Sequence, residues 1–366
     1  MFDVSAVDKN MAVVSTIDNA EYKMLNVKDE PFSVHGLILE SREDQFRRMP
    51  RSVAECINKG IKQLHKDTAG GRVCFRTDSS QVAISVKLPP RAMTTRMTWL
   101  VTAGFDIYEV SEGAYIYKGA YVPPAQCDGG FASVIGLGDR KMRDLVIHFP
   151  CYSAVLDLQI GIEPDATVEH SDPYGEKAPF ICYGSSITQG ACASRPGNAY
   201  SNILSRKLGI DHINLGFSGS CKGEMEMAAY IASQPMSLFL YDYDHNAPDA
   251  EHLAKTHEAF FLHIREKHPD LPILIASRTD YATVDEDTVQ TDKRRAVIEK
   301  TYENALRRGD REVAFIDGGA IPEKARELGL DPDICTVDSV HPNDVGFAFM
   351  ASVFAQEITK LLKRSS

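Results

Sequence analysis

The sequence lacks any hydrophobic run of the ~20 residues that a bilayer span requires, and it contains a single tryptophan. Residues 1–5 show no basic flank followed by an apolar stretch, so the chain as written carries no secretion signal. We therefore expect no membrane partner. The missing signal favours the cytoplasm slightly, and an exported chain whose signal has been removed stays an alternative.

Positive charge is in deficit. Lys and Arg number 40 against 51 Asp and Glu, which gives a formal net charge of −11. An acidic surface of this size repels phosphate backbones, so nucleic acid is not the expected partner. We expect a small molecule or a carbohydrate ester instead, and the sequence leaves the oligomeric state open.

The eight cysteines lack the paired spacing of a metal site or of a disulfide framework. Most are expected to be small buried apolar residues. Cys182, Cys192 and Cys221 lie near the region that carries the candidate chemistry, and a bridge among them is left open. No metal and no cofactor are predicted.

The length of 366 residues is more than twice the ~150-residue prior for one domain, so two domains are expected. Residues 1–165 contain short β-rich segments separated by turns, which predicts a jelly-roll-like β-sandwich. One helix, 51–65, has apolar residues at helical spacing and is expected to cap that sandwich. The predicted strands are 72–76, 81–88, 98–101, 114–118, 144–149 and 155–160.

After the polar stretch 163–177 the hydrophobic period changes. Short apolar runs now alternate with amphipathic helical segments, which predicts an α/β domain over residues 178–366. Its five strands are expected to form a flavodoxin-like parallel sheet covered by helices, with ligands at the carboxyl ends of the strands. The runs are 179–183, 212–215, 237–241, 272–276 and 313–316.

A serine pair follows the first of these runs, in the order Gly184-Ser185-Ser186-Ile187-Thr188. A serine where a strand turns into a helix places its hydroxyl at the sheet edge, among backbone amides. A helix-capping turn is the alternative. A phosphate loop is disfavoured because no lysine follows the last glycine, and the α/β-hydrolase elbow requires glycine where Thr188 stands.

A serine nucleophile needs a base and a carboxylate that orients the base. Asp338 and His341 stand three positions apart after the last predicted strand, at the same sheet edge. A solvent-facing salt link is the alternative. Gly219 and Asn246 follow the second and third strands, where they could donate hydrogen bonds to a tetrahedral oxyanion; their alternatives are a turn glycine and a capping asparagine.

Together these dispersed blocks resemble the SGNH, or GDSL-type, hydrolase family. The resemblance implies Ser186 as nucleophile, His341 as base and Asp338 as its orienter. It also implies an oxyanion hole made of the Ser186 amide, Gly219 and Asn246.

Two departures from the family pattern mark this sequence. Ser185 replaces the usual aspartate, so both adjacent serines stay candidates, with the frame of the block favouring Ser186. Asp244 and Ala247 replace the usual glycine and aspartate around Asn246, which suggests a subgroup with a different third loop.

The segment 102–108 resembles the Gly-x-Asp-Leu-Tyr signature of a β-sandwich domain that precedes some of these hydrolases, with Ile107 in place of leucine. Gly104 and Asp106 are turn-competent residues, so we expect the motif to hold the sandwich together. A sugar-binding surface is the alternative.

These observations favour a metal-independent serine esterase. The resemblance implies a small acyl group, such as acetyl, on a carbohydrate. Two alternatives stay open: a metal-dependent phosphoesterase that uses Asp242, Asp244, His245 and Asn246 as ligands, and a glycan-binding protein whose hydrolase domain is inactive.

Overall fold

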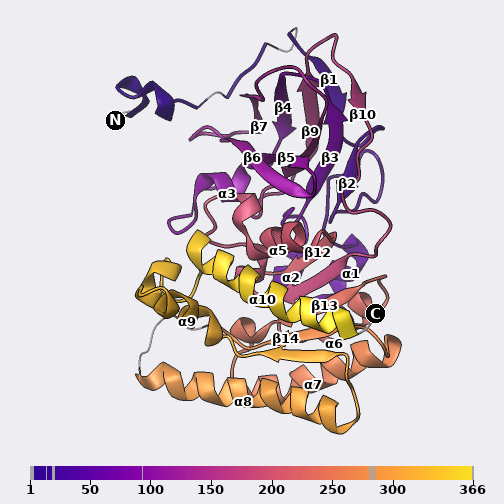
Figure 1. Ribbon diagram of the computed structural model, residues 1–366, viewed down its shortest axis with the longest axis vertical. Coiled ribbons are helices and arrows are strands. Elements are labelled where there is room, and N and C mark those ends of the chain that lie inside the picture. The colour runs from indigo at the N-terminus through magenta and orange to yellow at the C-terminus, as the bar shows by residue number, and fades with distance from the viewer. Residues whose placement is uncertain are drawn as a thin grey trace.

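The computed structural model describes residues 4–364 except 14, 19–20, 93, 280 and 282–284. A β-rich body, formed by the N-terminal part of the chain, stacks on an α/β body formed by the C-terminal part (Figure 1).

Two antiparallel sheets build the β-rich body, as expected for a sandwich. One has the order β1-β9-β4-β7, and the other has the order β10-β3-β8-β5-β6, with β2 paired to β3. The strands are β1 (Lys23–Asn26), β2 (Ser33–His35), β3 (Arg72–Thr77), β4 (Gln81–Lys87), β5 (Phe105–Ser111), β6 (Ala114–Tyr121), β7 (Gly130–Gly136), β8 (Arg143–His148), β9 (Asp157–Ile162) and β10 (Val168–Glu169).

Alternate residues of facing strands fill the sandwich core. Val82, Ile84 and Val86 of β4 pack in one cluster with Val73 and Phe75 of β3. Successive strand residues point to opposite faces, so this two-residue period buries one face of each sheet.

The predicted strand at 98–101 is wrong, because these residues begin helix α3 (Trp99–Ala103). Thr98 caps this helix, and its hydroxyl accepts a hydrogen bond from the Val101 amide at 3.1 Å. Short apolar runs do not distinguish strand from helix by periodicity alone.

The predicted helix 51–65 is two helices, α1 (Arg51–Ile57) and α2 (Lys59–Leu64). Asn58 separates them in an extended conformation, and its side chain accepts a hydrogen bond from the Ile61 amide at 2.9 Å. The expectation that this segment caps the sandwich is wrong: Ala54 and Ile61 pack in the core of the α/β body with Tyr183.

The five-stranded parallel sheet is confirmed, in the order β12-β11-β13-β14-β15. This is the flavodoxin-like order, in which ligands bind beyond the carboxyl ends of the central strands. The strands are β11 (Phe180–Gly184), β12 (His212–Gly216), β13 (Leu238–Asp242), β14 (Ile273–Ala276) and β15 (Val313–Ile316).

Helices cover both faces of this sheet. Phe180 and Cys182 of β11 face α5, α9 and α10, whereas Ile181 and Tyr183 face α6, α7 and α8 together with α1 and α2. The helices are α4 (Ser186–Gln189), α5 (Tyr200–Leu208), α6 (Met225–Ala232), α7 (Ala250–Lys267), α8 (Asp285–Arg307), α9 (Ala320–Glu327) and α10 (Asp344–Arg364).

Helix α10 is the one helix among the described residues that is long and apolar enough to cross a membrane, by length and composition alone. Phe347, Ala351, Phe354 and Ile358 of this helix are buried in the core of the α/β body. The apolar side of α10 therefore packs against the sheet.

Buried polar groups join the two bodies. Arg72 of β3 is fully buried and binds Asp211 and His212, with 2.8 Å to His212 Nδ1. Asp106, in the segment expected to hold the sandwich together, lies 2.9 Å from His148 within the sandwich and 2.7 Å from Arg195 across the joint. The segment therefore contacts both bodies and helps to join them. The burial of Asp106 keeps its carboxylate from a sugar ligand.

Candidate active site

The two adjacent serines have different surroundings. Ser185 is fully buried and caps α4, where its hydroxyl accepts a hydrogen bond from the Ile187 amide at 3.1 Å. Ser186 opens the helix, and its Oγ lies 3.0 Å from Nε2 of His341. The geometry therefore favours Ser186 as the reactive serine.

Gly184, the last residue of β11, permits this turn. A Cβ at this position would lie 2.1 Å from Thr188 Oγ1 and 2.3 Å from the carbonyl oxygen of Asp242. Any larger residue would push the start of α4 away from the end of β13. Glycine is thus required by the close approach of the two segments rather than by its φ angle.

Asp338 and His341 share one tight loop in front of α10. His341 Nδ1 lies 2.9 Å from Asp338 Oδ2, and the His341 amide donates to Oδ1 at 2.8 Å. Although partial burial opposes it, these contacts with His341 and the Val340 amide lower the pKa of Asp338 to about 2. The carboxylate is therefore ionised at neutral pH.

The two predicted oxyanion donors follow the strands on either side of β11. Gly219 has φ +64, and a Cβ there would meet nothing within 4 Å. Among the described residues its amide has no hydrogen-bond acceptor. Asn246 Nδ2 donates one hydrogen to the carbonyl oxygen of Phe217 at 3.0 Å, which leaves its second hydrogen for another acceptor.

A cavity of about 220 Å³ adjoins His341, and the sandwich supplies one of its walls. Tyr152 donates from its hydroxyl to the Ser186 carbonyl oxygen at 3.2 Å. Arg96 donates to Asp338 Oδ2 at 2.9 Å. The lining residues are Thr94, Thr95, Arg96, Met97 and Tyr152 from the sandwich, with Ala191, Cys192, Ser218 and His341 from the α/β body.

The sequence analysis did not identify Arg96 or Tyr152. Neither belongs to a motif, and both reach the site only because the two bodies pack together. A single sequence carries no signal for such a contact.

The residues proposed as metal ligands do not converge. Asp242 Oδ2 lies 3.3 Å from the hydroxyls of Thr188 and Tyr200, whereas Asp244 accepts a hydrogen bond from the Arg278 amide at 2.8 Å. No group of three His, Cys, Asp or Glu side chains placed to hold a metal occurs within the part of the chain that the structure describes. This arrangement of donors does not support the phosphoesterase alternative.

The possible bridge among Cys182, Cys192 and Cys221 is absent, since all eight cysteines are free. Cys182 and Cys221 are buried in the core, as expected for small apolar residues. Cys192 borders the active-site cavity.

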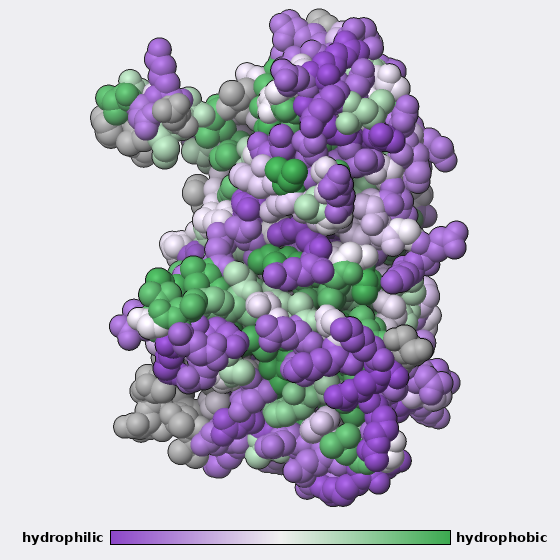
Figure 2. Space-filling view, in the orientation of Figure 1, coloured by the Kyte–Doolittle hydropathy of each residue, from purple (hydrophilic) through white to green (hydrophobic). Residues whose placement is uncertain are grey.

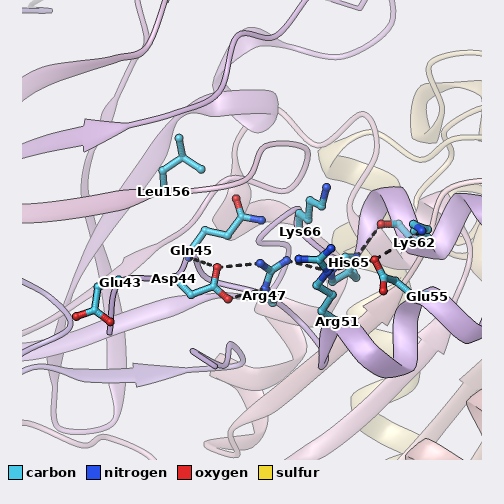
Figure 3. A pocket seen from close by; sticks show the side chains of 10 residues that line it. All are labelled: Glu43, Asp44, Gln45, Arg47, Arg51, Glu55, Lys62, His65, Lys66 and Leu156. Carbon is cyan, nitrogen blue, oxygen red and sulfur yellow. Dashed lines mark hydrogen bonds and ion pairs between the residues drawn. The ribbon is translucent and has the colours of Figure 1, made fainter. Parts of the chain in front are cut away.

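A larger cavity of about 560 Å³ lies against α1 and α2, and neither Ser186 nor His341 lines it (Figure 3). Its charged side chains largely neutralise one another: Arg47 pairs with Asp44 at 2.8 Å, and Arg51 pairs with Glu55 at 3.1 Å. Its lining includes no serine or cysteine side chain.

The segment that leads from α9 to His341 exposes several apolar side chains. Figure 2 shows a hydrophobic patch over the α9 region, within a surface that is otherwise largely hydrophilic. Leu328, Ile334, Val337 and Val340 are exposed in the segment that runs from α9 to His341.

Comparisons with known families agree with the fold. Residues 177–360 match the GDSL-like lipase/acylhydrolase family, and residues 22–168 match the N-terminal domain of SGNH-hydrolase-type esterases that carries the GxDLY motif. The chain therefore belongs to the GDSL-like lipase/acylhydrolase family and is an esterase-type hydrolase. No curated protein sequence gives a significant match.

Solved structures share the arrangement of both bodies. A GDSL-like lipase from Bacteroides ovatus ATCC 8483 superposes with a TM-score of 0.83 at 25% identity, covering 93% of this chain and 98% of that one. The salicylyl-acyltransferase SsfX3 from a tetracycline biosynthetic pathway gives 0.74 at 21%, covering 93% and 98%. A family two carbohydrate esterase from Clostridium thermocellum, in complex with cellohexaose, gives 0.58 at 14%, covering 91% and 99%.

Proposed function

We propose that this enzyme hydrolyses a small acyl ester, such as an acetyl ester, on a carbohydrate, with Ser186, His341 and Asp338 as its catalytic triad. The observation that carries the proposal is the continuous chain of contacts from serine to carboxylate. Ser186 Oγ lies 3.0 Å from His341 Nε2, and His341 Nδ1 lies 2.9 Å from Asp338 Oδ2.

In the proposed reaction, Ser186 Oγ attacks the ester carbonyl while His341 Nε2 accepts the hydroxyl proton. The ionised Asp338 stabilises the resulting imidazolium. The Ser186 amide, the Gly219 amide and Asn246 Nδ2 donate to the oxyanion of the tetrahedral intermediate. His341 then returns the proton to the leaving alcohol. Water attacks the acyl-enzyme while His341 accepts its proton, and the acid leaves as His341 returns that proton to Ser186 Oγ.

Two observations support the substrate class. The cavity beside His341 has a volume of about 220 Å³, which suits a compact group rather than a long acyl chain. The similar structures include a carbohydrate esterase with bound cellohexaose. Both are consistent with an acyl group removed from a sugar that lies in the open part of the site.

Replacing each serine separately tests the proposal. We expect Ser186→Ala to lower hydrolysis of p-nitrophenyl acetate and of acetylated cello-oligosaccharides by ~10³-fold or more, because attack requires that hydroxyl. Ser185→Ala is the matched control, and it should keep most of the activity while lowering stability by ~1 kcal/mol through loss of the helix cap. Equal activity of Ser186→Ala and the wild type would refute the proposal, and cello-oligosaccharide binding without turnover by the wild type would favour the glycan-binding alternative.

A further inference from the structure

Arg48 is a buried cation beneath the loop that carries the proposed oxyanion donor. Its side chain belongs to the N-terminal half of the chain and is 1% exposed. The guanidinium donates to the carbonyl oxygens of Gly216 and of Asn214, the latter at 3.3 Å, and to that of Leu64 at 2.7 Å. It also lies over the Phe217 ring, 4.2 Å from the ring centre.

This environment is unusual for an arginine. Among the described residues Arg48 forms hydrogen bonds to carbonyl oxygens but no salt bridge, and Asp67 is the main charge that favours its protonated form. Burying a charge without a direct ion pair is costly. Burial lowers its pKa to about 10, so the guanidinium stays protonated at neutral pH. Its hydrogen bonds to three carbonyl oxygens and its contact with the Phe217 ring connect the segment 214–219, which comprises the end of β12 and the loop after it, to α2.

A second set of hydrogen bonds holds the same segment from the side of Ser186. Gln189, at the end of α4, accepts a hydrogen bond from the Ser218 amide at 2.9 Å. Its amide nitrogen donates to the Cys151 carbonyl oxygen at 3.1 Å and to Asp67 Oδ2 at 3.3 Å. Cys151 and Asp67 both belong to the N-terminal half, so residues of that half orient the glutamine.

These hydrogen bonds leave the Gly219 amide without an acceptor among the described residues. Arg48 binds the carbonyl oxygens of Asn214 and Gly216 in β12, just before the loop, and Asn246 binds that of Phe217. Gln189 occupies the Ser218 amide. Carbonyl oxygens turned toward the intermediate would repel its negative charge, whereas the Gly219 amide is left free to donate to it.

We infer that Arg48 is a positioning residue that holds the segment 214–219, the end of β12 and the loop after it, in the conformation that aims the Gly219 amide at the oxyanion. The inference rests on the proposed esterase function. It assigns to the N-terminal half a part in catalysis that goes beyond lining the cavity. A lysine carries its donors on a single nitrogen and a neutral side chain lacks the charge, so neither reproduces the contacts that the guanidinium makes to three carbonyl oxygens from two nitrogens.

The test compares Arg48→Lys and Arg48→Ala with a matched control, Arg143→Lys. Arg143 is also a buried arginine that donates to three carbonyl oxygens, those of Leu137, Asp139 and Lys141, but it lies inside the sandwich. We expect both Arg48 variants to lose at least tenfold in kcat with KM changed by less than threefold, since the oxyanion forms only after substrate binds. The control should keep kcat within threefold.

Two further readouts separate positioning from general damage. Millimolar guanidinium should restore part of kcat in Arg48→Ala, whereas equal sodium chloride should not. Amide hydrogen exchange should become at least tenfold faster in 214–219 of Arg48→Lys and should change little in β15. If Arg48→Ala does not fold, the kinetics and exchange of Arg48→Lys decide the matter.

The outcomes distinguish this inference from the proposed function. Unchanged exchange in 214–219, or a kcat loss no larger than that of Arg143→Lys, would overturn the role of Arg48 even if the wild type is an active esterase. Faster exchange in 214–219, together with a wild type that hydrolyses no ester, would instead refute the proposed function. The segment would then have no role in catalysis.

Discussion

At the scale of single residues, the role of each serine depends on the hydrogen bonds that its hydroxyl already makes. Ser185 caps a helix and Ser186 faces His341, although the two are neighbours in the same block of sequence. The sequence could narrow the nucleophile to these two serines because strand, turn and helix are visible in the hydrophobic pattern. It could not show the contact from Arg96 to Asp338, since 242 residues separate them and no motif includes Arg96.

Asp338→Asn tests the carboxylate. The amide can still contact His341, but it cannot stabilise an imidazolium and can favour the wrong tautomer. We expect kcat to fall by ~10²–10⁴-fold with little change in the fold. Steady-state kinetics on p-nitrophenyl acetate with circular dichroism would check this, and a loss below threefold would show that His341 acts without the carboxylate.

Arg96→Ala tests the cation beside Asp338. The Arg96 side chain is 68% exposed, and exposed ion pairs contribute ~1 kcal/mol or less. We therefore expect kcat to change by less than tenfold and KM to rise, because the residue also forms part of the cavity wall. The kcat and KM of this variant should be measured at low and high salt. A kcat loss of 10³-fold would instead make Arg96 essential to the triad.

At the scale of elements, the ends of three adjacent parallel strands assemble the site. The sequence predicted all five strands of this sheet because each is a short apolar run buried on both faces. It failed at 98–101, where a capped helical turn has the same composition as a strand. It also predicted one helix over 51–65 where there are two, because the break at Asn58 is a capping interaction that hydrophobic spacing does not reveal.

Asp242, the last residue of β13, gives an element-scale prediction. Burial, aided by the nearby Asp244, raises the pKa of Asp242 to about 8. Because the folded state then binds more protons than the unfolded state between about pH 4 and 8, this carboxyl makes the protein less stable as pH rises through that window. Asp242→Asn removes the effect.

The melting temperature of Asp242→Asn relative to wild type should therefore increase from pH 4 to pH 8. Thermal melts across that range would measure it, with Asp270→Asn as the control at an exposed carboxyl. A difference between variant and wild type that stays constant with pH would contradict the raised pKa.

At the scale of the whole molecule, the sandwich packs on the α/β body and lines part of the candidate active site. Its buried groups Arg72 and Asp106 contact the α/β body, and its loop residues wall the cavity beside His341. Docking of this kind depends on the match between two folded surfaces. Hydrophobic periodicity describes each body separately, so the sequence predicted the two folds but not the joint between them.

Asp106→Ala tests the joint. The change leaves His148 and Arg195 without their buried partner, and breaking a buried pair costs ~3–5 kcal/mol. We expect the midpoint of urea unfolding to fall accordingly and the activity to decline with it. Asp165→Ala, which removes an exposed carboxylate paired with Arg140, should shift stability by ~0.5 kcal/mol or less. Equal effects of the two variants would show that the joint is not energetically important.

The most direct measurement is a crystal structure of the enzyme after reaction with an organophosphonate ester. We predict one covalent adduct on Ser186 Oγ, with the phosphoryl oxygen within hydrogen-bonding distance of the Ser186 amide, the Gly219 amide and Asn246 Nδ2. An adduct on Ser185 or on another residue, or a phosphoryl oxygen that points to solvent away from these three donors, would contradict it.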